Sequence, residues 1–426
     1  MRTAFRAEQL TDPHMKDAEK ALRTCVHCGF CTATCPTYLL LGDERDGPRG
    51  RIVLMQHMLE SEAPPTPETV KHLDRCLSCL GCKTACPSGV DYSALIDTSR
   101  SYIENHYRRP LPERLFRAFL LFVLTRPKLF AALSIVSRWF APILTRLPGK
   151  LGVMSRKARV GERKRVDGSV PDVSSGAPRI LLLPGCVQRT LAPGIDAAAT
   201  RVLAREDMRV ERLERSGCCG ALAYHLGKAE MGKEYARKVI RAYEEESAKG
   251  GVDAVLITAS GCSAFLKDYP RVFADEPEWK RRAEGFAAKV KDFTELARPA
   301  AAPAAAVAAA PVIAFHPPCT LQHGQKISGR GETLLSAAGF RLAPIPDAHL
   351  CCGSAGSYSL LQPEIADQLR ARKLAAIRST GAEIIASANI GCLTHLAGEL
   401  PTVHIAELLD WAGGGENPVR LEATSK

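Results

Sequence analysis

The sequence predicts a multidomain protein of mixed α+β and α/β class, in which a small α-helical, cysteine-rich domain precedes two duplicated α/β modules. Three observations support this prediction. The chain has 426 residues, more than one ordinary domain holds. Half of its 16 cysteines form two copies of one short motif near the N-terminus. The remaining eight recur in one order in two later segments, which indicates an internal duplication.

Changes in composition along the chain divide it into five expected segments. They are 1–105 (cysteine-rich domain), 106–175 (basic amphipathic helical linker), 176–297 (first module), 298–311 (Ala/Pro linker) and 312–415 (second module). The Ala/Pro segment is expected to be a linker because alanine and proline supply too little apolar bulk for a core.

The N-terminal domain contains a four-cysteine motif in two copies, each followed by proline. The copies are Cys25-x2-Cys28-x2-Cys31-x3-Cys35-Pro36 and Cys76-x2-Cys79-x2-Cys82-x3-Cys86-Pro87. This spacing is typical of the [4Fe-4S] ligands of bacterial ferredoxins. Zinc sites usually present paired cysteines with longer gaps, so zinc is the weaker interpretation. The motifs predict a ferredoxin-type domain with two [4Fe-4S] clusters.

The same spacing predicts which cysteines bind which cluster. Three closely spaced thiolates can bind one cluster, whereas the fourth cysteine of each motif lies beside the other cluster. We expect cluster 1 to be bound by Cys25, Cys28, Cys31 and Cys86, and cluster 2 by Cys76, Cys79, Cys82 and Cys35. His27 lies between ligands, but the cysteine set is complete without it, so we do not expect it to bind iron.

The stretch Gly47-Pro48-Arg49-Gly50-Arg51 lies between the motifs and contains two arginines. Cationic side chains near a cluster favour its reduced, more negative state, so they would tune its potential. The alternative is a helix start with solvated arginines. The sequence leaves both interpretations open.

Positive charge is concentrated in one part of the chain. The formal net charge is +11, and residues 101–166 alone contain 15 Lys and Arg against 3 Asp and Glu, so the rest of the chain is nearly neutral. This distribution argues against a nucleic-acid binder and favours one local anionic surface, a membrane or an acidic partner.

The basic segment is also apolar, but its longest uninterrupted apolar run is only residues 118–124. A spanning helix needs about 20 apolar residues, so we expect no membrane crossing. Short helices with apolar faces and arginines can lie in a membrane interface. Packing against other domains or docking of a subunit is the alternative.

The N-terminal residues have no apolar stretch of the secretory type, so we expect a cytoplasmic location, with peripheral contact at the inner face of the cytoplasmic membrane left open. Cytosolic thiols stay reduced. Metal ligation therefore explains 16 cysteines better than disulfides do.

The two later modules share an order of predicted elements. In each module, predicted strands and helices alternate with cysteines. The first module has strand 179–184, helix 193–205, helix 228–249 and strand 254–258. The second has strand 312–315, a helix near 332–338, a helix ending at 378 and strand 383–386. The first and second cysteines are 32 positions apart in both modules. Alternating strands and helices predict parallel α/β units, whose ligand sites gather at the carboxyl ends of strands.

The module cysteines are candidates for a further redox site. They are Cys186, Cys218, Cys219 and Cys262 in the first module, and Cys319, Cys351, Cys352 and Cys392 in the second. The alternative is that they are ordinary buried thiols, but their matched placement favours a site. The side chains that flank these cysteines are Tyr224, His225, His316, His323 and His349. The histidines could relay protons or merely support the site.

The combination closely resembles the iron-sulfur subunits of bacterial glycolate oxidase (glycolate dehydrogenase). The resemblance covers nearly the whole chain. Beyond the ferredoxin-type motifs it rests on residues 41–51, on Ser216-Gly-Cys-Cys-Gly-Ala221, on Cys319-Thr-Leu-Gln-His323 and on Ser387-Ala-Asn-Ile-Gly-Cys-Leu-Thr-His395. The paired modules also resemble the CCG modules of heterodisulfide reductases. Those modules end in Cys-x-x-Cys, whereas Ala259 and Asn389 stand at the earlier position here.

The resemblance implies an electron-transfer role rather than substrate oxidation. No G-x-G-x-x-G pattern opens a helix, so no flavin or nicotinamide site is expected on this chain. The family implies two flavin-type glycolate oxidase subunits with FAD, which oxidise glycolate to glyoxylate. It also implies a quinone or another acceptor. Two alternatives stay open: the equivalent subunit of a lactate or glycerol-3-phosphate dehydrogenase, and a non-redox assembly scaffold with structural clusters.

Overall fold

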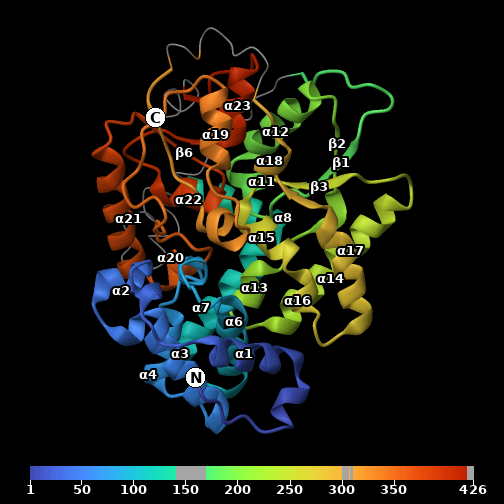
Figure 1. Cartoon of the computed structure of the whole chain (residues 1–426). Helices are drawn as coiled ribbons and strands as arrows, with labels where there is room; N and C mark the ends of the chain where they lie inside the picture. The colour runs from blue at the N-terminus through green and yellow to red at the C-terminus, as the bar shows by residue number, and fades with distance from the viewer. Residues whose placement is uncertain (141–168, 300–306, 308–309, 420–426) are drawn as a thin grey trace.

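The computed structural model describes residues 1–140, 169–299, 307 and 310–419. Figure 1 shows the N-terminal domain, in blue, at one end of the molecule, with the green-yellow first module and the orange-red second module above it. This arrangement confirms the predicted class, a small helical domain followed by two α/β modules.

The N-terminal domain is helical. Its elements are η1 (Gln9–Thr11), α1 (Pro13–Thr24), η2 (Phe30–Thr32), α2 (Pro36–Leu41), η3 (Glu44–Asp46), α3 (Pro48–Ser61), α4 (Pro67–Asp74), α5 (Gly81–Thr84) and α6 (Tyr92–His106). Several of these helices begin with proline at the first helical position. In α1 and α4 a side chain also caps the start, Asp12 and Thr66 respectively. Leu22, Met55 and Leu95 lie in the core that these helices enclose.

Helices α7 (Leu111–Leu124) and α8 (Pro127–Trp139) follow. One face of α7 is buried and includes Leu120 and Arg117, whose guanidinium pairs with Asp74 of α4 at 3.0 Å. No single helix in the described part of the chain is long and apolar enough to span a membrane. Together α7 and α8 reach that length and composition, but they bend by 105° at the break between them.

The first module is built on a four-stranded parallel sheet with strand order β2-β1-β3-β4. Its strands are β1 (Arg179–Leu182), β2 (Arg209–Arg212), β3 (Ala254–Ile257) and β4 (Val290–Asp292). Its helical elements are α11 (Gln188–Leu191), α12 (Pro193–Arg205), η4 (Glu214–Ser216), α13 (Ala221–His225), α14 (Ala229–Ser247), α15 (Ser260–Lys267), α16 (Tyr269–Val272), α17 (Pro277–Lys289) and α18 (Phe293–Leu296).

The second module repeats the plan with a three-stranded parallel sheet, β5-β6-β7. Its strands are β5 (Ile313–Phe315), β6 (Ile384–Ser387) and β7 (Thr402–His404). Its helical elements are the π-helical turn η6 (Thr320–Gly324), α19 (Arg330–Ala337), α20 (Tyr358–Leu361), α21 (Pro363–Arg378), α22 (Ile390–Leu396) and α23 (Ile405–Ala412). The four predicted strands are present. Strands β2, β4 and β7, which lie at sheet edges, were not predicted.

The modules pack together through α12 and α23, where the side chain of Arg201 donates to Asp410 at 2.5 Å. One hydrophobic core runs through both modules, from Leu256 of β3 to Trp411 of α23. Val307 and Ala310, in the segment expected to be a linker, are buried in this core. Part of the Ala/Pro segment therefore contributes to packing between the modules.

Candidate iron-sulfur centres

A first cavity lies between α1, the start of α3 and the loop after α5. All four cysteines expected for cluster 1 line it, namely Cys25, Cys28, Cys31 and Cys86. Burial raises the pKa of the Cys31 thiol to about 11, and the neighbouring thiols of Cys25, Cys86 and Cys28 also raise it. Cys86, from the second motif, therefore lies near the thiols of the first motif.

A second cavity lies beside the first. All four cysteines expected for cluster 2 line it, namely Cys35, Cys76, Cys79 and Cys82. Pro48, Cys82 and Tyr92 line both cavities, so the two sites are separated by little more than these side chains.

The donors at both cavities suit iron-sulfur clusters. Thiolates are the cluster ligands, and their sulfur atoms are stabilised by hydrogen bonds from the surrounding protein. The backbone N–H of Ser78 donates to the Sγ of Cys76 at 3.4 Å, and that of Val90 donates to the Sγ of Cys86 at 3.5 Å. The Tyr92 hydroxyl lies 3.8 Å from the Sγ of Cys76. The residues present therefore fit two clusters.

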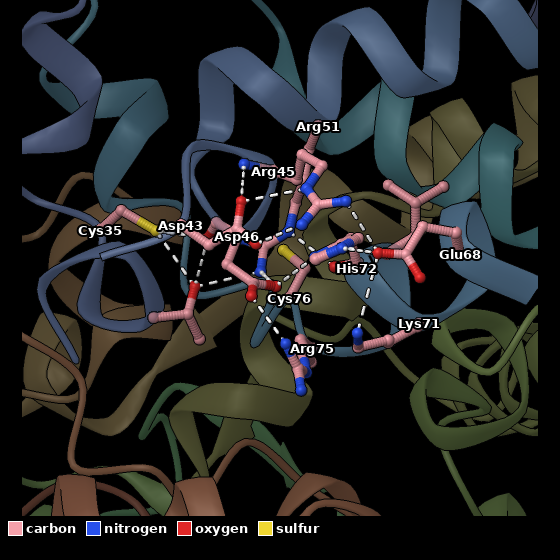
Figure 2. Close-up of polar contacts among 12 residues, drawn as sticks. Cys35, Asp43, Arg45, Asp46, Arg51, Glu68, Lys71, His72, Arg75 and Cys76 are labelled. Atoms are coloured by element: carbon pink, nitrogen blue, oxygen red, sulfur yellow. Dashed lines mark hydrogen bonds and ion pairs between the residues drawn. The ribbon is translucent and has the colours of Figure 1, made fainter. Parts of the chain in front are cut away.

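The arginine of α3 lies beside the second cavity. Figure 2 shows Arg51 between Cys35 and a set of polar partners. Its Nη1 lies 3.9 Å from the Sγ of Cys35, its Nε donates to the carbonyl oxygen of His72 at 2.8 Å, and its Nη2 pairs with Asp46 at 3.4 Å. Arg51 is fully buried, so the solvated alternative is wrong for this residue.

Asp46 anchors the same network. Its buried carboxylate pairs with His72 at 2.9 Å and with Arg75 at 2.8 Å, in addition to Arg51 (Figure 2). The other ring nitrogen of His72 contacts Glu68 at 2.9 Å. Because each buried charge has a partner, the network holds Arg51 in one position beside the cavity.

Two arginines act on the Cys76 thiol. Burial alone would raise its pKa, but the guanidiniums of Arg51 and Arg100 outweigh that effect, and the pKa is lowered. Arg100, on α6, also donates to the carbonyl oxygen of Cys76 at 2.6 Å. The second cavity therefore favours negative charge at Cys76, whereas burial raises the pKa of the neighbouring Cys79 and Cys82 thiols. Arg49 is more exposed; it pairs with Glu44 and lines the first cavity.

The four cysteines of the first module converge at the carboxyl end of its sheet. Cys186 follows β1, Cys218 and Cys219 precede α13, and Cys262 lies in α15 after β3. The Cys218 thiol is within hydrogen-bonding reach of Cys186 and Cys219, and the Cys219 thiol is within reach of Cys262.

The second module brings its four cysteines together in the same way. The Cys351 thiol is within reach of Cys319 and Cys352, and the Cys352 thiol is within reach of Cys392. Asn389, at the position where the wider pattern has a cysteine, donates its side-chain amide to the Sγ of Cys392 at 3.6 Å. His316 lies in the same cluster.

Glycine is required after each cysteine pair. Gly220 and Gly353 have φ angles of +90° and +94°, and their N–H groups donate to the Sγ of Cys218 and Cys351 at 3.5 and 3.4 Å. A Cβ atom on either glycine would lie 2.7 Å from a helix carbonyl oxygen, that of Gly232 or Ala366. The Cys-Cys-Gly sequence thus forms the same turn in both modules.

The second module adjoins the second cavity. Leu77 and Cys79 of the N-terminal domain pack in one hydrophobic cluster with Cys319 and Cys351. Burial raises the pKa of Cys79, and the nearby Cys319 thiol raises it further. The Tyr358 hydroxyl donates to the carbonyl oxygen of Arg75 at 3.0 Å. The second module site is therefore a neighbour of the cavity that holds Cys79.

Two of the other flanking histidines have structural partners. His323 contacts the Thr84 hydroxyl at 2.6 Å and the carbonyl oxygen of His349 at 3.0 Å, and His225 contacts Asp97 at 3.0 Å. Arg100, Tyr92 and Tyr358 were not expected at these sites. Their roles depend on contacts between distant segments, which no local motif reveals.

Comparisons with known proteins agree with this layout. Residues 21–90 match the family model of the 4Fe-4S dicluster domain, and residues 180–267 and 313–397 both match that of the cysteine-rich CCG domain. A crystal structure of a hypothetical protein from Helicobacter pylori has the same general fold, with a TM-score of 0.54, 11% identity and coverage of 96% of this chain and 75% of that one.

Several curated proteins are similar in sequence. The chain is 28% identical to lactate utilization protein A of Exiguobacterium sp., over 55% of this chain and 97% of that protein. It is 31% identical to the probable glycolate oxidase iron-sulfur subunit of Bacillus subtilis, over 93% of this chain and 95% of that one. It is 43% identical to the glycolate oxidase iron-sulfur subunit of Escherichia coli, over 97% of this chain and 99% of that protein. Together with the ferredoxin-type domain and the two CCG modules, this similarity shows that the chain belongs to the family of glycolate oxidase iron-sulfur subunits.

Proposed function

We propose that this chain receives electrons from FAD-containing partner subunits, which oxidise glycolate to glyoxylate, and passes them to a quinone-type acceptor. Cluster 1 is held by Cys25, Cys28, Cys31 and Cys86, and cluster 2 by Cys76, Cys79, Cys82 and Cys35. The CCG modules hold at least one further redox centre.

One observation supports this proposal most strongly: three cysteine sites adjoin one another in a row. The two cavities share Cys82 and Tyr92, and the second cavity contacts the second module through Cys79 and Cys319. The clusters supply one-electron chemistry when bound. A structural scaffold would not need its metal sites in such a series.

The surrounding residues set the conditions at each site. Buried Arg51 and half-buried Arg100 favour negative charge near Cys76, and the N–H groups of Ser78 and Val90 donate to the sulfur atoms of Cys76 and Cys86. Tyr92 is buried between the two sites, whereas Cys28 of the first site is exposed. These features favour a reduced state at the second cavity.

The test is reduction of the chain by its partners. The anaerobically purified complex is mixed with glycolate, lactate or glycerol 3-phosphate, and cluster reduction is followed by EPR. Reduction by glycolate alone supports the proposal. Reduction by lactate or glycerol 3-phosphate instead would show that the chain belongs to a different dehydrogenase. A cluster spectrum that stays unchanged in the presence of reduced flavin subunits would favour the assembly-scaffold role.

We propose a cytoplasmic location with peripheral membrane contact through α7 and α8. Leu115, Phe119 and Phe122 of α7 are exposed, and so are Ile135 and Val136 of α8. The surrounding sequence, residues 101–166, has a large excess of basic residues that would attract anionic lipid.

Flotation of the full chain with lipid vesicles tests this location. We expect binding to vesicles that contain phosphatidylglycerol and weaker binding to phosphatidylcholine alone. Phe119→Ser with Phe122→Ser should abolish it, whereas Val53→Ser, at an exposed apolar residue of α3, should not. Equal binding of all three proteins would refute the contact.

A further inference from the structure

The second module contains a buried histidine that lies among cysteine thiols. His316 directly follows β5 and is completely buried. One of its ring nitrogens and the Sγ atoms of Cys352 and Cys392 all lie within 4.8 Å of one another. The imidazole therefore stands among the thiols of the module site.

Among the described residues, neither ring nitrogen of His316 meets an oxygen or nitrogen partner, and the polar group beside the ring is the thiol of Cys352. Burying an unpaired polar group costs on the order of 1–3 kcal/mol, so such groups are rare in folded proteins. Other buried histidines are paired: His72 contacts Asp46 and Glu68, and His395 contacts the carbonyl oxygen of Ala366 at 3.2 Å. A metal shared with the neighbouring thiols would satisfy the ring nitrogen that no oxygen or nitrogen of the described residues reaches.

The spacing of the three donor atoms suits one metal atom. Thiolate and imidazole ligands bind at about 2.3 and 2.0 Å, so donors on a tetrahedral metal lie roughly 3.3–3.8 Å apart. Contacts below 4.8 Å need only small adjustments to reach that geometry. The soft sulfur and imidazole donors select iron or zinc rather than magnesium or calcium.

The duplication provides an internal comparison. His316 lies three residues before Cys319, and the residue three before Cys186 in the first module is Leu183, which is buried in that module's core. The two modules have matching cysteines but differ at this position. A role in common packing would not require the imidazole, because leucine fills the equivalent place.

We propose that His316 is a metal ligand in the second module, together with Cys352 and Cys392. The inference rests on the proposed function in one respect, that the metal is the iron of a redox centre. A neutral imidazole in place of a thiolate makes such a centre less negative and raises its reduction potential. The second module would then be a favourable acceptor for electrons from the adjoining site at Cys79.

The experiment uses the full-length chain, purified anaerobically, with 15N-labelled histidine. Iron and zinc content are measured, and pulsed EPR of the reduced protein detects nitrogen bound to a paramagnetic centre. His316→Gln removes the ligand, and His316→Cys replaces it with a thiolate. His395→Gln is the matched control, because His395 is a buried histidine of the same module.

We expect a histidine nitrogen coupling in the wild type and in His395→Gln that is absent from both His316 variants. His316→Gln should also lose metal, and His316→Cys should retain it, while the EPR signals of the two ferredoxin-type clusters persist in each as evidence of folding. Unchanged metal content and unchanged nitrogen coupling in His316→Gln would overturn the proposal.

A zinc result separates this inference from the proposed function. If the second module contains zinc that is lost in His316→Gln and kept in His316→Cys, His316 is a ligand as proposed. The redox role of the second module is then wrong, because zinc does not change oxidation state.

Discussion

The guanidinium Nη1 of Arg51 lies 3.9 Å from the Sγ atom of Cys35, inside the N-terminal domain. Arg51 is held there by Asp46 and by the carbonyl oxygen of His72. A permanent positive charge is therefore buried beside one of the eight motif cysteines. This charge should influence the centre in the second cavity more than the one in the first.

Arg51→Met should lower the reduction potential of the second cluster. A unit charge about 8 Å away contributes roughly 2 kcal/mol at an effective dielectric constant of about 20, on the order of 90 mV for one electron. Potentiometric titration followed by EPR measures the change. Arg51→Lys keeps the charge and should shift the potential less. Equal shifts in both variants would contradict an electrostatic effect.

Substitution of a cysteine in one motif should remove the cluster that the other motif mainly binds, when the cysteine is the fourth of its motif. We expect Cys35→Ser to lose the same EPR signal as Cys79→Ser, and Cys86→Ser the same signal as Cys28→Ser, because each fourth cysteine lines the other motif's cavity. Iron content and EPR of the reduced variants measure this. If Cys35→Ser instead matched Cys28→Ser, the crossed assignment would be wrong.

Gly353→Ala should destabilise the second module more than Gly356→Ala. Both glycines have positive φ, but a Cβ at Gly353 would lie 2.7 Å from the carbonyl oxygen of Ala366. A Cβ at Gly356 would meet no atom within 4 Å among the described residues other than its two chain neighbours. Overpacking adds about 1–3 kcal/mol to the backbone cost that the two share. Thermal unfolding by circular dichroism compares them. Identical midpoints would show that the turn can move away from Ala366.

Asp97→Asn should weaken docking of the N-terminal domain on the first module. Asp97, on α6, pairs with His225 of α13 at 3.0 Å and with Arg271 of α16 at 2.8 Å. Burial opposes ionisation, but His225 and Arg271 outweigh it and hold the pKa of Asp97 below its usual range. Removing one partner of a buried pair costs about 3–5 kcal/mol, and less here because Arg271 keeps Asp268.

The same pair predicts a pH dependence. Because the folded-state pKa of Asp97 is lowered, its stabilisation is complete above the unfolded pKa of about 3.9 and disappears as the pH falls through the lower folded value. The difference in urea midpoint between wild type and Asp97→Asn, followed by tryptophan fluorescence, should narrow as the pH falls below about 4. A difference that persists at lower pH would contradict a contribution from the ionised carboxylate.

The predictable features were those encoded by short stretches of chain. The spacing of Cys25 to Cys35 and of Cys76 to Cys86 predicted two ferredoxin-type motifs, and the matched family model covers the same residues. The equal 32-residue offsets predicted two related modules, which the sheets and the CCG matches confirm. Strands with three or four consecutive apolar residues were recognisable. Edge strands such as β2 and β4 were not predicted, because they are short and contain charged residues such as Arg209 and Lys291.

The sequence by itself determined the type of domain and the number of cysteine sites, because covalent spacing places ligands from one loop within reach of one centre. Only the tertiary structure decided which segments meet. It buried Arg51 beside Cys35, brought Cys79 against Cys319, placed Val307 in a core shared by two modules and left His316 among thiols without another partner. These contacts join residues far apart in the chain, and they depend on the packing of whole helices and sheets, which no local pattern specifies.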